Sequence, residues 1–375
     1  MKLEKRRTFL RKVLVGTTTL WLPVGCSQKA TTTSTTTVKP KSKIGVALLG
    51  LGSYSTYQLA PALQKTKHCY LAGIVTGSPH KIPEWQKKYN ILDANTYSYD
   101  NLSSIADNDA IDVVYIVTPT GTHAKFAIQA ANAGKHVWCE KPMAMTVEEC
   151  QSIIDACKQN KVELTIGYRM QHETNTKELI SYATSKPFGA MTKIETAACY
   201  SGGQPRGWRA SKAMGGGALY DMGVYTVNGI RYASQQQPVK VISAKQYTNR
   251  PALFEEVDET TEYQLELANG LVAYGKTSVG APENFLKVTC ESGHYQLSPM
   301  QSYNGVVGNR SDGVQIDAFV DSQQALQMDD DALAILEKRP MMIKGEEGME
   351  DIRICLLYTS PSPRDATLSR MPSSA

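Results

Sequence analysis

The 375-residue sequence lacks an apolar run long enough to span a bilayer. The apolar part of its N-terminal segment, residues 13–24, covers about 12 residues, roughly 18 Å as a helix, whereas a spanning helix needs about 20. We therefore predict no transmembrane segment. The chain also lacks a strong charge of one sign, because its net charge is only +4 and several basic residues fall near its start. We therefore expect no partner among nucleic acids.

Paired cysteines and clustered metal ligands are missing as well. The eight cysteines form no CxxC pair. Cys150 and Cys157, seven residues apart on an expected helix, would lie about 10 Å from each other, too far for a disulfide. We expect most cysteines to be buried thiols. His123, His136 and His172 are widely spaced and show no metal-ligand pattern, so no metal site is predicted.

Residues 1–26 have the layout of a signal peptide. A basic start precedes the weakly apolar segment, and a small residue stands before Cys26. The sequence KRRTFLRK at residues 5–12 is typical of a twin-arginine export signal, and an ordinary secretory signal is the alternative. PVGC at residues 23–26 is close to a lipoprotein cleavage box. We expect a periplasmic or otherwise exported protein, with a lipid anchor at Cys26 as an open possibility.

The rest of the chain divides into segments that differ in composition and in the pattern of their apolar residues. Residues 27–42 are rich in threonine and are interpreted as a linker. Residues 43–166 alternate short apolar runs with helical stretches, which is typical of a parallel sheet with helices on both faces. Residues 167–355 carry longer alternating strands, with helices near 217–232 and 323–338. The predicted fold class is α/β, with an N-terminal Rossmann dinucleotide-binding domain and a C-terminal α+β domain whose open sheet is mostly antiparallel.

Residues 356–375 carry no apolar period and are rich in serine and proline. They do not continue the amphipathic pattern GEEGMEDIRIC that precedes them. We interpret this tail as foreign to the rest of the chain, and we expect disorder or poor packing beyond Cys355.

A glycine-bearing turn follows the first predicted strand and opens the first predicted helix. Its sequence GLGSYS contains Gly50, Gly52, Ser53 and Tyr54, which would meet a dinucleotide pyrophosphate with backbone N–H groups at a helix N-terminus. The third glycine of the usual pattern is Ser55, a small residue that still permits close packing of helix on strand. An ordinary strand-to-helix turn is the alternative.

The second predicted strand ends without a carboxylate, although an NAD-preferring site places Asp or Glu there against the ribose hydroxyls. The sequence at that point is TGSPHK, and Thr76, Ser78 and Lys81 can hold a 2′-phosphate through hydroxyl groups and a positive charge. NADP is therefore favoured over NAD. A polar surface turn is the alternative interpretation of these residues.

Further motifs lie along the chain: TPTGTH at 118–123, AGKHVWCEKP at 133–142, GYR at 167–169, GWR at 207–209 and GGGALYDMGVY at 215–225. Together they resemble the glucose-fructose oxidoreductase / inositol dehydrogenase / MocA family, over about residues 43–355. DMGVYTVNGIRY and QALQMDDDALAI resemble its glucose-fructose oxidoreductase branch in particular. The resemblance implies a peptide before Pro142 that is often cis. It also implies cofactor contacts, which we assign to Thr118, Pro119, His123, Glu140, Lys141, Arg169, Trp208 and Arg209.

Asp221 and Tyr225 fall four residues apart at a predicted helix start, so both can reach one substrate. Oxidising a sugar hydroxyl requires a base for its proton as hydride leaves carbon for a nicotinamide. The resemblance implies that Tyr225, at a position where many relatives carry histidine, is this acid/base. It also implies that Lys141 stabilises the phenolate and that Asp221 orients the sugar. A core tyrosine and a helix-capping aspartate are the alternative.

These motifs predict an NADP-dependent sugar oxidoreductase that binds a small sugar or polyol between its two domains. Export of an already folded enzyme favours a tightly bound NADP, recycled by oxidising one sugar and reducing another. An NAD-dependent glycoside hydrolase of the same fold and a non-catalytic surface protein that binds a sugar or nucleotide are the alternatives. The open sheet is expected to form a homodimer or homotetramer.

Overall fold

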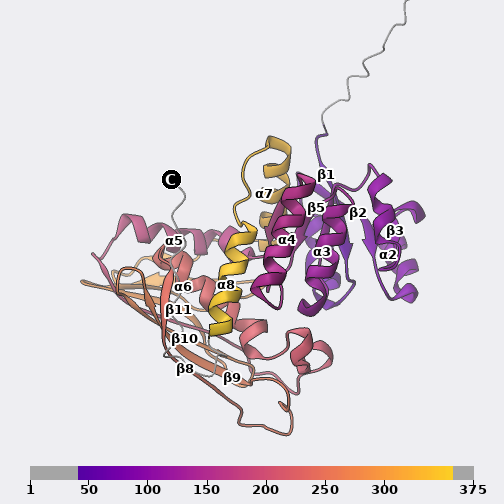
Figure 1. Ribbon diagram of the computed structural model, residues 1–375. Helices are drawn as coiled ribbons and strands as arrows, with labels where there is room; N and C mark the ends of the chain where they lie inside the picture. Colours follow the sequence, from indigo (N-terminus) through magenta and orange to yellow (C-terminus); the bar gives the residue numbers. More distant parts are fainter. Residues whose placement is uncertain (1–40, 358–375) are drawn as a thin grey trace, which may run out of the picture. The chain divides into compact units, whose positions relative to one another are not determined.

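The computed structural model describes residues 41–357, which belong to one compact unit (Figure 1). Two lobes make up this unit, each built on its own sheet. Two parts of the chain lie outside the described residues. Residues 1–40 contain the predicted signal peptide, Cys26 and nearly all of the predicted linker, and residues 358–375 contain most of the predicted foreign tail. Among the described helices, none combines the length and the apolar character needed to cross a membrane.

The first lobe contains a six-stranded parallel sheet with the strand order β3-β2-β1-β4-β5-β6. Strands β1 and β4 are buried along their whole length, as expected for a sheet covered on both faces. The order reverses between β1 and β4, and a crevice opens at the carboxyl ends of strands at such a point. The strands are β1 Ile44–Leu49, β2 Cys69–Val75, β3 Thr96–Tyr97, β4 Val113–Ile116, β5 His136–Cys139 and β6 Leu164–Ile166.

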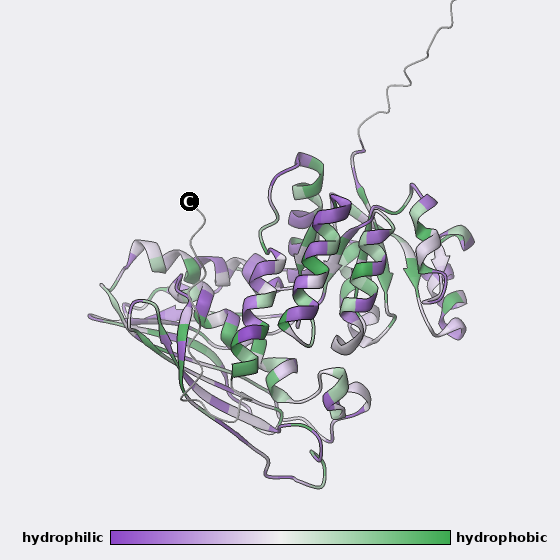
Figure 2. Ribbon diagram, in the orientation of Figure 1, coloured by the Kyte–Doolittle hydropathy of each residue, from purple (hydrophilic) through white to green (hydrophobic). Residues whose placement is uncertain are grey.

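Helices cover this sheet, as the Rossmann prediction requires. Figure 2 shows apolar and polar residues on different faces of α3 and α4, and their buried residues recur at helical spacing. Helix α4 begins after Thr146, whose hydroxyl accepts a hydrogen bond from the backbone N–H of Glu149 (3.2 Å). The helices are α1 Ala60–Leu63, α2 Ile82–Tyr89, α3 His123–Asn132 and α4 Val147–Asn160.

The second lobe contains an eight-stranded sheet with the order β14-β13-β12-β11-β7-β10-β9-β8. Its neighbouring strands run antiparallel except for β7 and β10, which are parallel. The prediction of an open, mostly antiparallel sheet is therefore confirmed. The strands are β7 Met191–Cys199, β8 Pro238–Tyr247, β9 Thr260–Leu267, β10 Val272–Ser278, β11 Asn284–Cys290, β12 His294–Leu297, β13 Gly308–Arg310 and β14 Gln315–Ile316.

Two helices of the second lobe differ from the prediction. The helix expected near 217–232 begins as a π-helical turn, Leu219–Gly223, and continues as α6, Val224–Ser234, which is buried throughout. Helix α5, Thr174–Ser185, was not predicted, because threonine, serine and asparagine are weak helix formers. It is stabilised by the Glu173 carboxylate, which accepts the N–H of Thr176 (2.6 Å), and by the burial of apolar side chains on its inner face.

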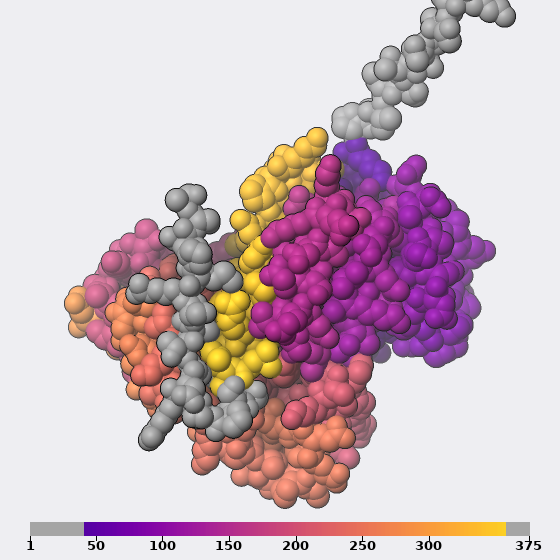
Figure 3. All heavy atoms as spheres, viewed as in Figure 1, coloured from indigo at the N-terminus to yellow at the C-terminus, as the bar shows by residue number. Residues whose placement is uncertain are grey.

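The last two helices, α7 Gln323–Glu337 and α8 Gly345–Leu357, return to the first lobe. Helix α7 packs on α1 and β2, and α8 packs on both α4 and α6. Figures 1 and 3 show α8 at the junction of the two lobes. Helix α8 ends at Leu357, two residues beyond the predicted boundary at Cys355. Leu356 and Leu357 are half-buried against the core.

The cysteines of the described residues are buried free thiols, as predicted for most of them. Cys150 and Cys157 both face the interior from α4, and neither forms a disulfide.

Candidate active site

A pocket of about 910 Å³ opens at the carboxyl ends of β1, β2, β4 and β5. Residues of the second lobe, including the turn at 208–209 and the start of the helix at 221–225, complete its wall. Every residue proposed from the sequence as catalytic or cofactor-binding lines this one pocket: Gly50, Gly52, Ser53, Tyr54, Thr76, Ser78, Lys81, Thr118, Pro119, His123, Glu140, Lys141, Arg169, Trp208, Arg209, Asp221 and Tyr225.

The glycine turn has the backbone that close approach to a ligand requires. Gly50 has φ +101°, and a Cβ added there would lie 2.8 Å from the carbonyl oxygen of Val117, so only glycine fits. A Cβ added to Gly52 would meet nothing within 4 Å. The buried Ser55 hydroxyl donates to the carbonyl oxygen of Gly50 (2.5 Å). Serine therefore replaces the third glycine and also closes the turn.

One of the polar residues after β2 forms a hydrogen bond with the turn that follows β1. The Ser78 backbone N–H donates to the hydroxyl of Thr76 (3.0 Å), which is buried (2% exposed). The Lys81 ammonium donates to the carbonyl oxygen of Leu51 (2.7 Å). An ammonium has three donors, so Lys81 keeps hydrogen-bonding capacity for an anion in the pocket.

His123 fixes the loops that follow β4 and β5. Its buried ring lies between two carbonyl oxygens, with Nε2 2.8 Å from that of Thr118 and Nδ1 2.9 Å from that of Pro142. Burial lowers the pKa of His123, and the backbone hydrogen bonds oppose this shift. The Lys141–Pro142 peptide is cis, as the family resemblance implied. Since both ring nitrogens face backbone oxygens, His123 lines the pocket as a positioning residue.

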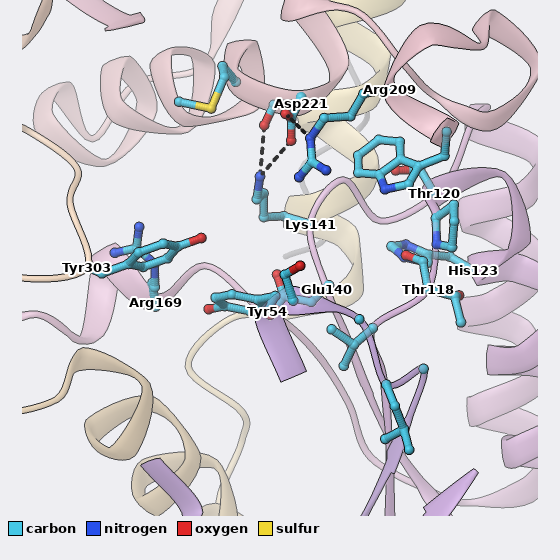
Figure 4. Close-up of a pocket in the computed structure, with 18 of the residues that line it drawn as sticks. Tyr54, Thr118, Thr120, His123, Glu140, Lys141, Arg169, Arg209, Asp221 and Tyr303 are labelled. Carbon is cyan, nitrogen blue, oxygen red and sulfur yellow. Dashed lines mark hydrogen bonds and ion pairs between the residues drawn. The ribbon is translucent and has the colours of Figure 1, made fainter. Parts of the chain in front are cut away.

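Lys141, Asp221 and Tyr225 form the polar centre of the pocket. Figure 4 shows Lys141 pointing toward Asp221. The Lys141 ammonium donates to the backbone carbonyl of Asp221 (2.8 Å), lies 3.9 Å from its Oδ1 and lies 4.4 Å from the centroid of the Tyr225 ring. Nε of Arg209 donates to Oδ2 of Asp221 (2.9 Å). Two cations therefore flank one carboxylate beside the tyrosine ring.

Arg209 comes from the short turn Gly207–Ala210, in which its guanidinium lies 4.4 Å from the centroid of the Trp208 ring. This stacking holds the arginine where it can reach Asp221. Both residues were assigned from the GWR motif.

Glu140 is buried beside Lys141, and its Oε1 accepts a hydrogen bond from the Tyr115 hydroxyl (2.6 Å). Burial raises the pKa of Glu140, while the bond from Tyr115 and the charges of Lys141 and Arg169 partly counter this. A fixed acceptor of this kind can orient the strand end that carries Lys141.

Arg169 links the pocket to a loop that the sequence did not single out. Its guanidinium, 2% exposed, lies 5.7 Å from the Tyr225 ring centroid and 5.0 Å from that of Tyr303, and it donates to the carbonyl oxygen of Ser302 (2.8 Å). Tyr303 in turn stacks on Tyr54 at 5.8 Å (Figure 4). Residues 301–303 belong to an irregular segment between β12 and β13, which shows no periodicity from which a site could be predicted.

Comparison with known proteins gives two family matches. The oxidoreductase family with an NAD-binding Rossmann fold matches residues 44–168, and the GFO/IDH/MocA C-terminal domain matches residues 176–296. The chain is also similar to the aldose-aldose oxidoreductase of Caulobacter crescentus, solved with glycerol. That similarity has 32% identity and a TM-score of 0.81, and it covers 84% of this chain and 96% of the other.

Other relatives are more distant or cover less of their length. A D-xylose 1-dehydrogenase (NADP(+)) of Haloarcula marismortui is 30% identical over 205 residues, which span 52% of this chain and only 55% of that protein. The structure of KijD10, a 3-ketoreductase of Actinomadura kijaniata in complex with NADP and TDP-benzene, has 17% identity and a TM-score of 0.74. It shows the fold alone. From the two family matches and the similarity along nearly the whole described chain, this protein belongs to the GFO/IDH/MocA family of oxidoreductases.

Proposed function

We propose that the chain is an NADP-dependent oxidoreductase that acts on a sugar or polyol. The observation that carries this proposal is the contact of Lys141 with both Asp221 and the Tyr225 ring, in the same pocket as the glycine turn. A proton-transfer group, a positive charge beside it and a carboxylate for hydroxyl groups are the parts that oxidation of an alcohol requires. Named NADP-dependent xylose and inositol dehydrogenases among the relatives support it.

The residues present fit a nicotinamide dinucleotide, which when bound accepts or donates a hydride. The backbone at Gly52, where an added Cβ would meet nothing within 4 Å, leaves room for a pyrophosphate. Thr76, Ser78 and Lys81 would hold the 2′-phosphate. Thr118, held in place by His123, would line the dinucleotide site beyond the turn.

In the proposed mechanism Asp221, oriented by Arg209, accepts hydrogen bonds from hydroxyl groups of the substrate. Tyr225, acting as a phenolate, takes the proton of the reacting hydroxyl and becomes the neutral phenol. The ammonium of Lys141 and the buried guanidinium of Arg169, both near the Tyr225 ring, stabilise the negative charge on the phenolate. The same groups return the proton when a carbonyl is reduced.

We further propose that NADP stays bound between turnovers, so that one sugar is oxidised and a second is reduced. The test is the absorbance and fluorescence of the purified protein, first as isolated and then after adding glucose and fructose in turn. We expect a reduced-nicotinamide signal that rises with one sugar and falls with the other. A signal that never responds to sugars would contradict an oxidoreductase, and cleavage of a chromogenic glycoside would instead support a hydrolase. A reaction that requires added NADP would contradict only the bound cofactor.

Replacing Lys81 with alanine should reduce the preference for NADP over NAD. A hydrogen bond to a charged group contributes about 1.5–3 kcal/mol, so we expect the Kd for NADP to rise by roughly 10- to 100-fold while that for NAD changes little. Lys87→Ala, at an exposed lysine of α2 outside the pocket, is the control. If Lys81→Ala weakened the binding of NADP and NAD equally, Lys81 would support the loop and would not contact the 2′-phosphate.

We also propose that the outer face of the second sheet forms a homodimer or homotetramer interface. Large apolar side chains on it, Ile242 and Tyr274, are 40% and 37% exposed and support this proposal. Light scattering on a size-exclusion column checks the mass. Export by the twin-arginine pathway and lipid attachment at Cys26 stay predictions about residues outside the described part.

A further inference from the structure

A group of three potential metal ligands lies outside the active-site pocket. His172 ends the 3₁₀ turn Arg169–His172, and Asp330 and Asp331 belong to α7. One ligand atom from each residue lies within 4.8 Å of the other two. His172 and Asp331 are buried (1% and 0% exposed), whereas the Asp330 side chain is 30% exposed. The group is therefore buried on one side and accessible to an ion on the other.

In the part of the chain that the structure describes, several buried nitrogen and oxygen atoms of these three side chains lack a hydrogen-bond partner. Within residues 41–357, both ring nitrogens of His172 and Oδ2 of Asp331 are buried without a hydrogen-bond partner. Nδ1 of His172 lies 3.5 Å from Oδ2 of Asp330, an ion-pair distance too long for a good hydrogen bond. A buried polar atom without a partner destabilises the folded state. Three such atoms in one place indicate a bound species that the chain itself does not supply.

We propose that His172, Asp330 and Asp331 bind one divalent transition-metal ion. Imidazole nitrogen and carboxylate oxygen are the ligands that zinc takes in proteins. A fully buried imidazole is neutral and offers a lone pair, since a buried charge would be costly. Two carboxylates supply negative charge for a divalent ion, and Arg339, paired with Asp330, balances part of it. Three protein ligands leave a fourth position of a tetrahedral site for water.

The neighbours of the carboxylates hold them in place. Oδ1 of Asp331 accepts a hydrogen bond from the Thr165 hydroxyl (3.3 Å), and Oδ1 of Asp330 accepts one from the Arg339 guanidinium (2.5 Å). In each carboxylate the other oxygen, Oδ2, is left for the ion. Ligands bonded at about 2.1 Å in a tetrahedron lie roughly 3.4 Å apart. Nδ1 of His172 and Oδ2 of Asp330, 3.5 Å apart, already have about this spacing.

The ion would fasten the 3₁₀ turn to α7 next to the active site. Arg169 begins the same turn, and Gln323 of α7 already accepts a hydrogen bond from its guanidinium. Holding His172 to α7 would therefore hold Arg169 near Tyr225 and Tyr303. This assignment concerns a structural ion and does not depend on the proposed function.

The test uses the full chain, treated with a chelator, dialysed and titrated with zinc chloride in a calorimeter, with metal content measured by mass spectrometry. We expect one zinc per chain and an unfolding temperature that rises with zinc concentration. Asp331→Asn keeps the size of the side chain and an oxygen for Thr165 but removes the charge. It should weaken zinc binding by at least about tenfold. His172→Gln should do the same.

The control is His80→Gln, at an exposed histidine, which should bind zinc as the unaltered chain does. Two results would overturn the proposal. One is the absence of zinc binding in the unaltered chain, which would leave an ordered water as the occupant. The other is equal zinc binding by the unaltered chain and Asp331→Asn, which would place the ion elsewhere. If both variants fail to fold, the stoichiometry and the zinc-dependent unfolding temperature of the unaltered chain still decide.

Discussion

Replacing Tyr225 with phenylalanine is expected to lower kcat by about 10²–10⁴-fold, which is the usual contribution of a positioned general acid or base. The change removes one hydroxyl from a side chain that is 8% exposed, so the packing of α6 should persist. The contacts of Lys141 with Asp221 do not involve that hydroxyl. We therefore expect substrate KM to change little. Steady-state kinetics with the sugar that reduces the bound nicotinamide measures both constants.

Tyr232→Phe is the matched control for Tyr225→Phe. Tyr232 lies further along the same helix, and its buried hydroxyl has no hydrogen-bond partner in the described part of the chain. This control should keep full activity. A Tyr225→Phe protein with nearly normal kcat would rule out the tyrosine as the acid/base and leave it a packing role.

Arg231→Ala should lower the free energy of unfolding by about 3–5 kcal/mol, because it leaves the buried carboxylate of Asp351 without an opposite charge. Arg231 forms an ion pair with Asp351, which is fully buried in α8. Asn228 also donates to Asp351 (2.9 Å), but an amide carries no compensating charge. Urea unfolding followed by circular dichroism measures the loss.

The loss should depend on pH. Burial raises the pKa of Asp351 to about 6, above the value near 3.9 of an unfolded aspartate. The folded state therefore binds this proton more tightly, so the contribution of Asp351 to stability falls as pH rises from about 4 through 6. Without Arg231 the carboxylate is uncompensated above that window. The difference between Arg231→Ala and the unaltered chain should thus be larger at pH 8 than at pH 5.

Arg353→Ala is the control for this prediction. Arg353 pairs with Glu350 within α8 at 3.3 Å, and both side chains are partly exposed. Exposed pairs contribute about 0–1 kcal/mol, so little stability should be lost. Similar losses in both arginine variants would mean that the Arg231 pair is not special.

The sequence predicted the pocket well because its parts follow strands. Gly50, Thr76 and Glu140 each come directly after a strand of the first sheet, and Thr118 comes two residues after β4. Parallel strands place their carboxyl ends at one edge. Position in the chain therefore implied position in space. The helix expected to carry Cys150 and Cys157 is α4, whose buried residues recur at helical spacing.

Tyr303 and the His172 group could not be predicted, because each depends on contacts between distant segments. Tyr303 reaches Tyr54 across the two lobes from an irregular loop. The spacing of the histidines predicted no metal, and only folding brings Asp330 and Asp331 to His172. The π-helical turn at Asp221 was missed for another reason, since its residues also suit an α-helix.

Helix α8 also constrains the order of folding. It is the last element of the described chain, yet it packs on α4 of the first lobe and α6 of the second. Nearly the whole second lobe separates α4 from α8 in sequence, so their contact closes a very long loop. The outer layer of the nucleotide-binding lobe can form only after the second lobe has been synthesised. Until then, α4 can pack only on elements of its own lobe such as α3, and the part of its surface that α8 covers lacks its partner.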